Sequence, residues 1–263
     1  MICAGIDAGS RTTKVVLFDP EQSRIVGSGL VDQGVEQHRL AAELFDRTCQ
    51  NAQVDRAAVS AIVATGYGRN AVRFADTTIS EITCHARGVY HLTPEVRTII
   101  EIGGQDSKVI TLEDGGRVRD FSMNDRCAGG SGRFLEVVAA RLGVDLTRLG
   151  ELSRQSRQTA LISSMCVVFA ETEIIGLLAE GVAAPDIASG VQKAIARRVA
   201  ALAGRAVAPP VRFTGGVALQ ADMVRALETA LSCPVSASPL PQYTGALGAA
   251  ILANPQSDTR PLL

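Results

Sequence analysis

The sequence predicts an α/β protein of two lobes with mixed sheets, on the basis of three observations. The segment from Ile6 to Leu17 recurs without a gap 94 residues later, from Ile100 to Thr111. Apolar strands alternate with segments of helical spacing, and hairpin turns add antiparallel strands. A chain of 263 residues, 46% of them hydrophobic, has the material for one large domain or two lobes.

Each expected element follows from local patterning. Short apolar runs bounded by Gly, Pro or Asp predict strands, and longer runs with apolar residues three or four positions apart predict helices. The expected strands lie at residues 2–18 (two strands around a glycine turn), 24–32, 59–64, 98–102, 108–112, 118–121, 211–214 and 235–237. The expected helices lie at residues 37–52, 80–90, 186–204, 218–231 and 245–253, within a mostly helical region from 128 to 205.

Composition excludes several classes of function. A net charge of −1 without any basic run argues against a nucleic-acid partner or an anionic membrane surface. No apolar stretch is long enough to span a membrane, and the N-terminus reads as a core strand rather than a signal peptide, so we expect a cytoplasmic protein. In that compartment the six cysteines are not expected to form a disulfide framework.

The first copy of the repeat has the chemistry of a phosphate-binding turn. Gly9 lets backbone amides approach phosphate oxygens, Lys14 can neutralise a phosphate, and Asp7 can hold hydrated Mg²⁺. Hydroxyl groups for further hydrogen bonds come from Ser10, Thr12 and Thr13. Taken alone, such a short glycine motif is equally compatible with an ordinary hairpin turn.

Two later turns strengthen the phosphate interpretation. The second copy repeats the acid, the glycine and the lysine, with candidate nucleotide-binding residues Gly103, Gly104 and Lys108. A third glycine turn, at Gly215 and Gly216 with Gln220 behind it, follows a strand and suits a ribose or an α-phosphate. Three such turns in this order favour a nucleotide site over three unrelated hairpins.

The order of two acid–glycine hairpins and a later Thr-Gly-Gly turn resembles the acetate/sugar kinase–Hsp70–actin superfamily. The resemblance implies actin-like lobes built on ribonuclease H-like five-stranded sheets, with ATP between them. It implies a first lobe at residues 1–95, completed by a C-terminal helix over 243–263, and a second at 96–242. Asp7, Glu101 and Gln105 are then the catalytic candidates. An amide orients water but is a poor general base, which predicts slow hydrolysis without a partner.

Two cysteines stand before segments expected to be helices. Cys127 precedes Ala128-Gly129-Gly130, and Cys166 precedes Val167. A helix N-terminus stabilises a thiolate, or an anionic cluster bound by it. Two thiolates are too few for a cubane cluster, although a twofold dimer would bring four together. From spacing alone, both could equally be small buried core residues.

Five strings resemble the activators of 2-hydroxyacyl-CoA dehydratases and the related ATPase subunits of benzoyl-CoA reductase, over about residues 2–253. They are Ala64–Asn70, Ser80–Ala86, Ile102–Asp106, Asn124–Ala128 and Pro239–Ala250. The resemblance implies a homodimer that holds one [4Fe-4S] cluster on Cys127 and Cys166 of each subunit. Glu101 departs from the Asp expected there, which lengthens the arm toward Mg²⁺ or water.

The implied function is an ATP-driven one-electron donor. A reduced ferredoxin or flavodoxin would supply the electron, Mg²⁺-ATP would drive its transfer, and a 2-hydroxyacyl-CoA dehydratase or CoA-ester reductase would accept it. A small-molecule kinase of the same fold and a non-redox nucleotide switch are the alternatives. The other candidate residues read as structural: Cys3, Cys49 and Cys233 as packing residues, Cys84-His85 as packing rather than a metal pair, and Glu171 and Glu173 as helix-surface or salt-bridge residues.

Overall fold

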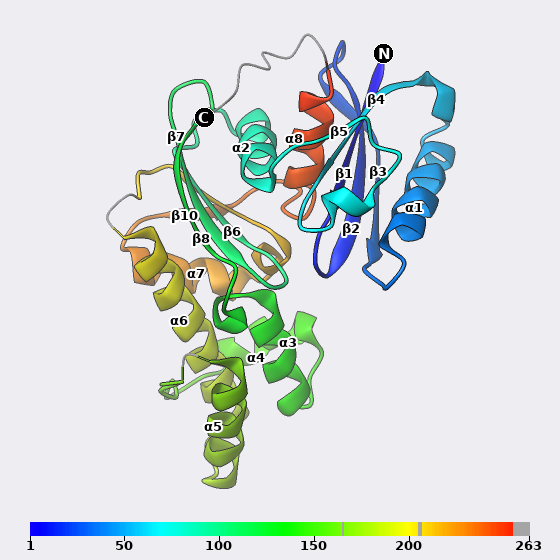
Figure 1. Cartoon of the computed structure of the whole chain (residues 1–263). Coiled ribbons are helices and arrows are strands. Elements are labelled where there is room, and N and C mark those ends of the chain that lie inside the picture. The colour runs from blue at the N-terminus through cyan, green and yellow to red at the C-terminus, as the bar shows by residue number, and fades with distance from the viewer. Residues whose placement is uncertain (165, 205–206, 255–263) are drawn as a thin grey trace. The chain divides into compact units, whose positions relative to one another are not determined.

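The computed structural model describes residues 1–164, 166–204 and 207–254 and divides them between two compact units (Figure 1). The first unit comprises Met1–Arg97, Ile110–Phe121 and the segment that begins at Ser238. The second unit comprises Thr98–Val109 and Ser122–Ala237. The expected C-terminal helix is observed as α8 (Thr244–Leu252); the remainder of the range expected for it, from residue 255, lies outside the described residues.

The first sheet is mixed, with strand order β3-β2-β1-β4-β5. Its strands are β1 (Ile2–Ala8), β2 (Thr12–Asp19), β3 (Arg24–Asp32), β4 (Val59–Thr65) and β5 (Thr77–Thr78). Strands β1 and β2 are antiparallel, with Asp7 opposite Lys14. Strands β1 and β4 are parallel, with Asp7 opposite Thr65. The end of β1 therefore brings the first acid beside two different neighbours.

The second sheet repeats this order, with β8, β7, β6, β9 and β10 in the places of β3, β2, β1, β4 and β5. Its strands are β6 (Thr98–Ile102), β7 (Ser107–Leu112), β8 (Val118–Asn124), β9 (Val211–Thr214) and β10 (Val235–Ala237). Strands β6 and β9 are parallel, and Glu101 lies opposite Thr214. The duplication seen in one turn thus extends to a whole sheet, and the predicted fold class with two five-stranded sheets is confirmed.

Helices cover both faces of the first sheet. Helix α1 (Gln37–Asn51) covers one face, while α8 and α2 (Glu81–Leu92) lie on the other (Figure 1). Alternation along β1 sends Ile6 into the core on the α1 side and Gly5 toward α8. A Cβ on Gly5 would lie 2.0 Å from the Ala246 carbonyl oxygen. The small-residue sequence of α8 therefore reflects its close packing on the strand that carries Asp7.

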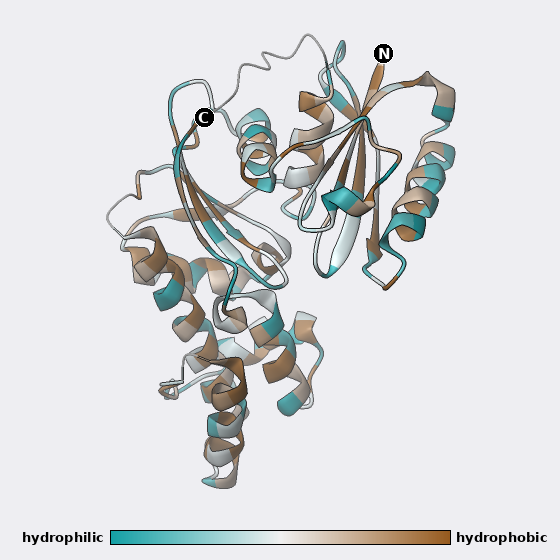
Figure 2. Ribbon diagram, viewed as in Figure 1, coloured by the Kyte–Doolittle hydropathy of each residue, from teal (hydrophilic) through white to brown (hydrophobic). Residues whose placement is uncertain are grey.

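The second unit differs by a long helical insertion between β8 and β9. The insertion contains α3 (Gly132–Arg141), α4 (Leu149–Arg154), α5 (Val167–Ala179) and α6 (Ala184–Ala203), and α7 (Ala221–Leu231) follows β9. Helices α3, α6 and α7 bury apolar side chains such as Phe134, Ile187 and Leu227 in a core that they share with Phe213 of β9. Helix α5 is hydrophobic along most of its length (Figure 2). Both cysteine motifs lie in this insertion.

The observed elements differ from the expected ones in small ways. Helix α7 begins at Ala221 because Gly216–Leu219 forms a separate 3₁₀ turn. Strand β8 runs three residues further than expected, to Asn124. Strand β5 has only two residues, too few to produce a periodic pattern. Among the helices of the described residues, none has the length and apolarity needed to cross a bilayer.

Candidate functional site

The two repeated turns have the same backbone closure. In the first, the Gly9 amide donates to the Thr12 carbonyl at 3.1 Å. In the second, the Gly103 amide donates to the Asp106 carbonyl, also at 3.1 Å. Each turn thereby connects the strand that ends at the acid to the strand that begins near the lysine.

In the first turn, the acid and the lysine form an ion pair that is mostly, but not fully, buried. Lys14 Nζ lies 3.2 Å from Asp7 Oδ2. The Asp7 side chain is 8% exposed and the Lys14 side chain 14% exposed. Both groups therefore remain close enough to the surface to meet a charged ligand or a hydrated cation.

In the second turn the lysine is enclosed. Lys108 Nζ lies 2.8 Å from Glu101 Oε2 and 2.8 Å from Asp106 Oδ2, and its side chain is only 2% exposed. The sequence placed Lys108 among the candidate nucleotide-binding residues. In the structure two carboxylates surround its ammonium group, so Lys108 holds Glu101 and Asp106 in place.

A Thr-Gly turn at the end of the neighbouring parallel strand packs against each acid. Gly66 follows Thr65 with φ +84°, and Gly215 follows Thr214 with φ +89°. A Cβ on Gly66 would lie 2.4 Å from Asp7 Oδ1, and one on Gly215 would lie 2.7 Å from Glu101 Oε1. Only glycine combines this backbone conformation with this close approach. The duplicated site therefore consists of an acid turn and a Thr-Gly turn in each unit.

The other predicted nucleotide-binding residues differ in exposure. Gln105 and Gly216 are exposed, whereas Gly9, Ser10, Thr12, Gly103 and Gly104 are partly exposed. Thr13 is fully buried, and its hydroxyl has no hydrogen-bond partner among the described residues. Gln220 donates through Nε2 to the Leu146 carbonyl at 2.9 Å, while its Oε1 is buried without a partner in the same set. Direct contact with a nucleotide is thus open to the partly exposed turn residues.

Backbone hydrogen bonds connect the second turn to the first cysteine segment. The Gly132 amide donates to the Gly103 carbonyl and the Arg133 amide to the Gly104 carbonyl, both at 2.8 Å. These amides belong to the first turn of α3, which begins five residues after Cys127. Any displacement of the turn at Gly103 is therefore transmitted directly to the start of α3.

Cys127 and Cys166 are the exposed thiols of the chain. Cys3, Cys49 and Cys84 are buried, and Cys233 is half-buried. Cys127 precedes a 3₁₀ turn at Ala128–Gly130, and Cys166 is the N-cap of α5. Asn124 fixes the first of these positions, because its side chain accepts from the Cys127 amide and donates to the Cys127 carbonyl. The predicted position of each cysteine just before a helix is confirmed.

One arginine on α6 contacts both cysteine segments. Arg198 donates to the Gly129 carbonyl through Nη1 and to the Ser164 carbonyl through Nη2. Its guanidinium also lies 5.5 Å from the centre of the Phe134 ring. Burial lowers the pKa of Arg198, while the nearby Cys127 and Cys166 thiols act in the opposite direction. An arginine remains protonated in proteins, so a positive charge lies between the two segments.

Glu173 fixes the backbone that leads to Cys166. Its carboxylate accepts hydrogen bonds from the Ser163 amide and hydroxyl at 2.8 Å and from the Ser164 amide at 2.9 Å. Partial burial alone would raise the pKa of Glu173, but these hydrogen bonds outweigh it and lower the pKa to about 2. Glu173 is therefore a loop-holding residue rather than a helix-surface acid, whereas Glu171 pairs with Arg141 as expected.

The two exposed thiols of one chain could provide half of the ligands of a cluster that needs four thiolates. Soft thiolates are the ligands of iron–sulfur centres, and each chain presents two exposed ones beside the Arg198 cation. Within the described residues of one chain, no group of three or more His, Cys, Asp or Glu could hold a metal ion. Cys84 and His85 behave as packing residues: burial raises the pKa of Cys84 to about 12, and His85 Nδ1 lies 2.9 Å from Thr244 Oγ1.

Several of these residues were missed in the sequence. The Thr65-Gly66 turn carries a usable signal, because the same dipeptide recurs at the end of β9 as Thr214-Gly215. Arg198 carries no such sequence signal. A single arginine in a long helix looks like a surface residue unless the positions of the contacting loops are known. Asp106 lies inside the second turn, but its role as a second partner for Lys108 depends on the side-chain geometry.

Comparison with known proteins gives the family. Residues 4–253 match the model of the BadF/BadG/BcrA/BcrD ATPase family. The chain is 45% identical over 254 residues to the activator of lactoyl-CoA dehydratase from Anaerotignum propionicum, covering 96% of this chain and 97% of that protein. It is 32% identical over 260 residues to a benzoyl-CoA reductase subunit from Thauera aromatica, covering 95% and 92%.

A solved structure agrees with this result. The activator of 2-hydroxyisocaproyl-CoA dehydratase from Clostridium difficile, with bound ADPNP, superimposes with a TM-score of 0.90 at 40% identity. The match covers 96% of this chain and 94% of that one. The fold is that of the actin-like ATPases, and the resemblance stated from the sequence is confirmed.

Proposed function

We propose that this chain, which belongs to the BadF/BadG/BcrA/BcrD ATPase family, is an ATP-dependent one-electron donor that activates a 2-hydroxyacyl-CoA dehydratase. One observation carries the redox part of the proposal. Of six cysteines, the two that are exposed begin helical turns, and Arg198 ties both of their loops together.

The nucleotide is held by the duplicated turns. Asp7 and Glu101 orient hydrated Mg²⁺ or the attacking water, and Gln105 helps to position that water. The amides and hydroxyls of Gly9, Ser10, Thr12, Gly103, Gly104 and Gly216 bind phosphate oxygens and the ribose, with Lys14 as the accessible cation. Lys108 and Thr13 support these residues from buried positions, and Gln220 does so from a partly exposed position through its hydrogen bond to the Leu146 carbonyl.

Two copies of the chain complete the redox site. A [4Fe-4S] cluster, when bound, supplies one-electron chemistry at low potential. Cys127 and Cys166 of each copy would provide its four thiolates. Exposed apolar side chains flank Cys166, with Leu161 72%, Val168 67% and Phe169 68% exposed. Such a patch beside the thiols supports a homodimer, because a large exposed apolar patch marks an interaction surface.

Nucleotide state reaches the cysteines through the backbone. The carbonyls of Gly103 and Gly104 accept from the first amides of α3, so a shift of the phosphate turn moves the start of α3. Arg198 then couples the Cys127 segment to the Cys166 segment. ATP can drive such a change only by binding two arrangements of the chain unequally.

The electron passes from an external donor protein to a partner enzyme. A reduced ferredoxin or flavodoxin gives up one electron, and the partner dehydratase or CoA-ester reductase gains it while ATP is hydrolysed to ADP and phosphate. An ATPase component of a benzoyl-CoA reductase is the second candidate. The higher identity to the lactoyl-CoA dehydratase activator, 45% against 32%, favours the dehydratase partner.

Iron and sulfide analysis after strictly anaerobic purification tests the proposal. About four irons per dimer are expected from a cluster with four thiolate ligands. Cys127→Ser and Cys166→Ser should each abolish the iron content, since either change removes two of four ligands. Cys233→Ser is the matched control, because this half-buried thiol is remote from both segments in sequence.

Activation assays complete the test. The purified protein, ATP and a strong reductant are added to a purified 2-hydroxyacyl-CoA dehydratase, and turnover of its substrate is followed. Activation should require ATP and both exposed cysteines. An iron-free protein that hydrolyses ATP only when a small metabolite is added would instead identify a kinase of the same fold.

A further inference from the structure

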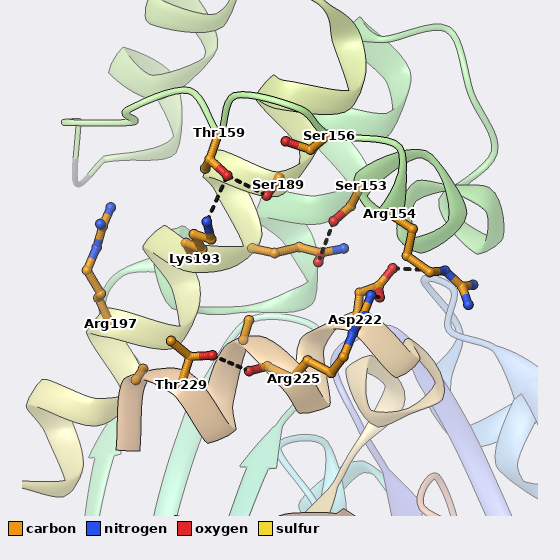
Figure 3. A pocket seen from close by; sticks show the side chains of 13 residues that line it. Ser153, Arg154, Ser156, Thr159, Ser189, Lys193, Arg197, Asp222, Arg225 and Thr229 are labelled. Atoms are coloured by element: carbon orange, nitrogen blue, oxygen red, sulfur yellow. Dashed lines mark hydrogen bonds and ion pairs between the residues drawn. The ribbon is translucent and has the colours of Figure 1, made fainter. Parts of the chain in front are cut away.

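A cavity of about 580 Å³ lies in the second unit, lined by residues of α4, α6 and α7 and of the segment that follows α4 (Figure 3). Cavities of this size accommodate small organic ligands. No lining residue belongs to the turns at Asp7, Glu101 or Gly215, and none belongs to the cysteine segments. The proposed ATPase and redox functions leave this cavity without a role.

The lining of the cavity is strongly basic. Its charged side chains are Arg154, Lys193, Arg197, Arg225 and a single acid, Asp222. Asp222 already has partners, since its Oδ2 lies 3.4 Å from Arg154 Nε and its Oδ1 accepts from Arg225. Lys193 and Arg197 therefore add positive charge that no acid of the cavity compensates.

Lys193 and Arg197 lie one helical turn apart on α6 (Figure 3). Lys193 Nζ donates to the neutral Thr159 hydroxyl at 2.7 Å. Arg197 has no hydrogen bond or ion pair within the described part of the chain. Both side chains are exposed, so both can turn toward an anion without unfolding the helix.

A buried amide provides a second, independent indication of a ligand. Gln192 lines the cavity and is 2% exposed. Its Oε1 accepts from the Ser153 hydroxyl at 3.1 Å, but its Nε2 has no partner among the described residues. A buried donor without a partner costs about 1–3 kcal/mol, and an acceptor atom in the cavity would relieve this cost once the side chain turns to expose Nε2.

We propose that this cavity binds a small phosphate-bearing anion, at a site separate from the nucleotide turns. Lys193 and Arg197 supply the charge, and the Gln192 amide supplies a directed donor. Phosphate fits this lining because it combines negative charge with several acceptor oxygens. The proposal does not depend on the proposed redox function.

Calorimetric titration with inorganic pyrophosphate tests the site on the whole protein saturated with ADP, so that the nucleotide turns are occupied. One pyrophosphate should bind per chain. The double variant K193Q/R197Q should weaken binding at least tenfold. Arg148→Gln removes one positive charge from an exposed position of the same unit that does not line the cavity, and it should leave binding unchanged.

A second variant separates direct contact from general charge. Gln192→Met retains the bulk of the side chain and all of the charges but removes the amide, and it should also weaken binding. Absence of binding to the ADP-saturated protein would overturn the proposal. Equal binding by K193Q/R197Q would also overturn it. Iron content is measured on the same samples, so failure of this site is distinguishable from failure of the redox function.

Discussion

The two copies of the acid turn share one backbone but differ in how they treat charge. In the first, Lys14 and Asp7 form a single pair near the surface, with the lysine side chain 14% exposed. In the second, Lys108 is 2% exposed and contacts both Glu101 and Asp106. The first lysine remains available to a ligand, while the second is a structural counter-ion. Duplication therefore preserved the frame while the roles of equivalent residues diverged.

The connections after the third strand differ even more. Between β3 and β4 the first unit has α1 and one 3₁₀ turn, whereas between β8 and β9 the second unit inserts α3 to α6. Both exposed cysteines lie in that insertion. The two units therefore share the acid turn, and the second unit alone adds a helical insertion that carries the exposed cysteines.

Replacing the lysine of each turn should reveal the largest difference in stability between the two turns. Lys108→Met removes the ammonium group that pairs with the buried Glu101 and with Asp106, whose side chain is 21% exposed, and it should lower the free energy of unfolding by about 3–5 kcal/mol. Lys14→Met, at a more exposed pair, should cost about 1–2 kcal/mol. Urea denaturation followed by circular dichroism measures both values. Equal losses would contradict the difference in burial.

The Thr-Gly turns should respond alike in both copies. Gly66→Ala and Gly215→Ala place a Cβ 2.4 Å from Asp7 Oδ1 and 2.7 Å from Glu101 Oε1. Each should lower the unfolding free energy by more than about 1 kcal/mol, and displacement of the acid should reduce ATP hydrolysis by about 100-fold.

Gly115→Ala is the matched control for these variants. Gly115 has φ +82°, close to that of Gly66, but a Cβ there would meet nothing within 4 Å. Gly115→Ala should lower the free energy of unfolding only by the backbone strain, about 1 kcal/mol, and should leave ATP hydrolysis unchanged. A loss of hydrolysis in this control would show that strain alone, rather than contact with the acid, explains the other two results.

Glu173 tests the insertion that distinguishes the second unit. Its pKa falls from 4.5 to about 2 on folding, so its ionised form stabilises the folded state above about pH 4.5, and this contribution disappears as the pH falls toward 2. Glu173→Gln should therefore cost about 1–2 kcal/mol at pH 7 and progressively less below pH 4.5. Thermal unfolding across this pH range measures the effect.

An exposed acid at the C-terminal end of α5 serves as the control for this variant. Glu180→Gln, at the C-cap of α5, should change the free energy of unfolding at pH 7 by no more than about 0.5 kcal/mol. A pH-independent cost for Glu173→Gln would mean that the carboxylate charge does not hold the Ser163 and Ser164 segment.

The smallest effects on stability are expected at the turn tips, where Arg11 and Gln105 occupy equivalent positions and are both exposed. Replacing either by Ala should change the unfolding free energy by no more than about 0.5 kcal/mol. Only Gln105→Ala should slow ATP hydrolysis, by at least about tenfold, if this amide positions the attacking water. An equal loss for Arg11→Ala would assign the two tips the same role.

The sequence predicted most of the architecture, because strands and helices here follow local patterns. The strand Val211–Thr214 and the strand Val235–Ala237 match their expected ranges, and the cysteines precede helical turns as expected. The burial of Lys108 could not be foreseen in this way. It depends on Asp106 turning toward the ammonium group, and a one-dimensional pattern does not contain that orientation.

By itself, the sequence determined the duplicated turns, the α/β fold and the position of two cysteines before helical turns, because each depends on residue type and spacing along the chain. The tertiary structure alone decided that Lys108 is enclosed while Lys14 is not, and that Gly66 and Gly215 press against the two acids. It also decided that Arg198 joins segments 69 and 34 residues away. Such contacts form only when segments that are distant in the sequence pack together, so the local sequence pattern does not predict them.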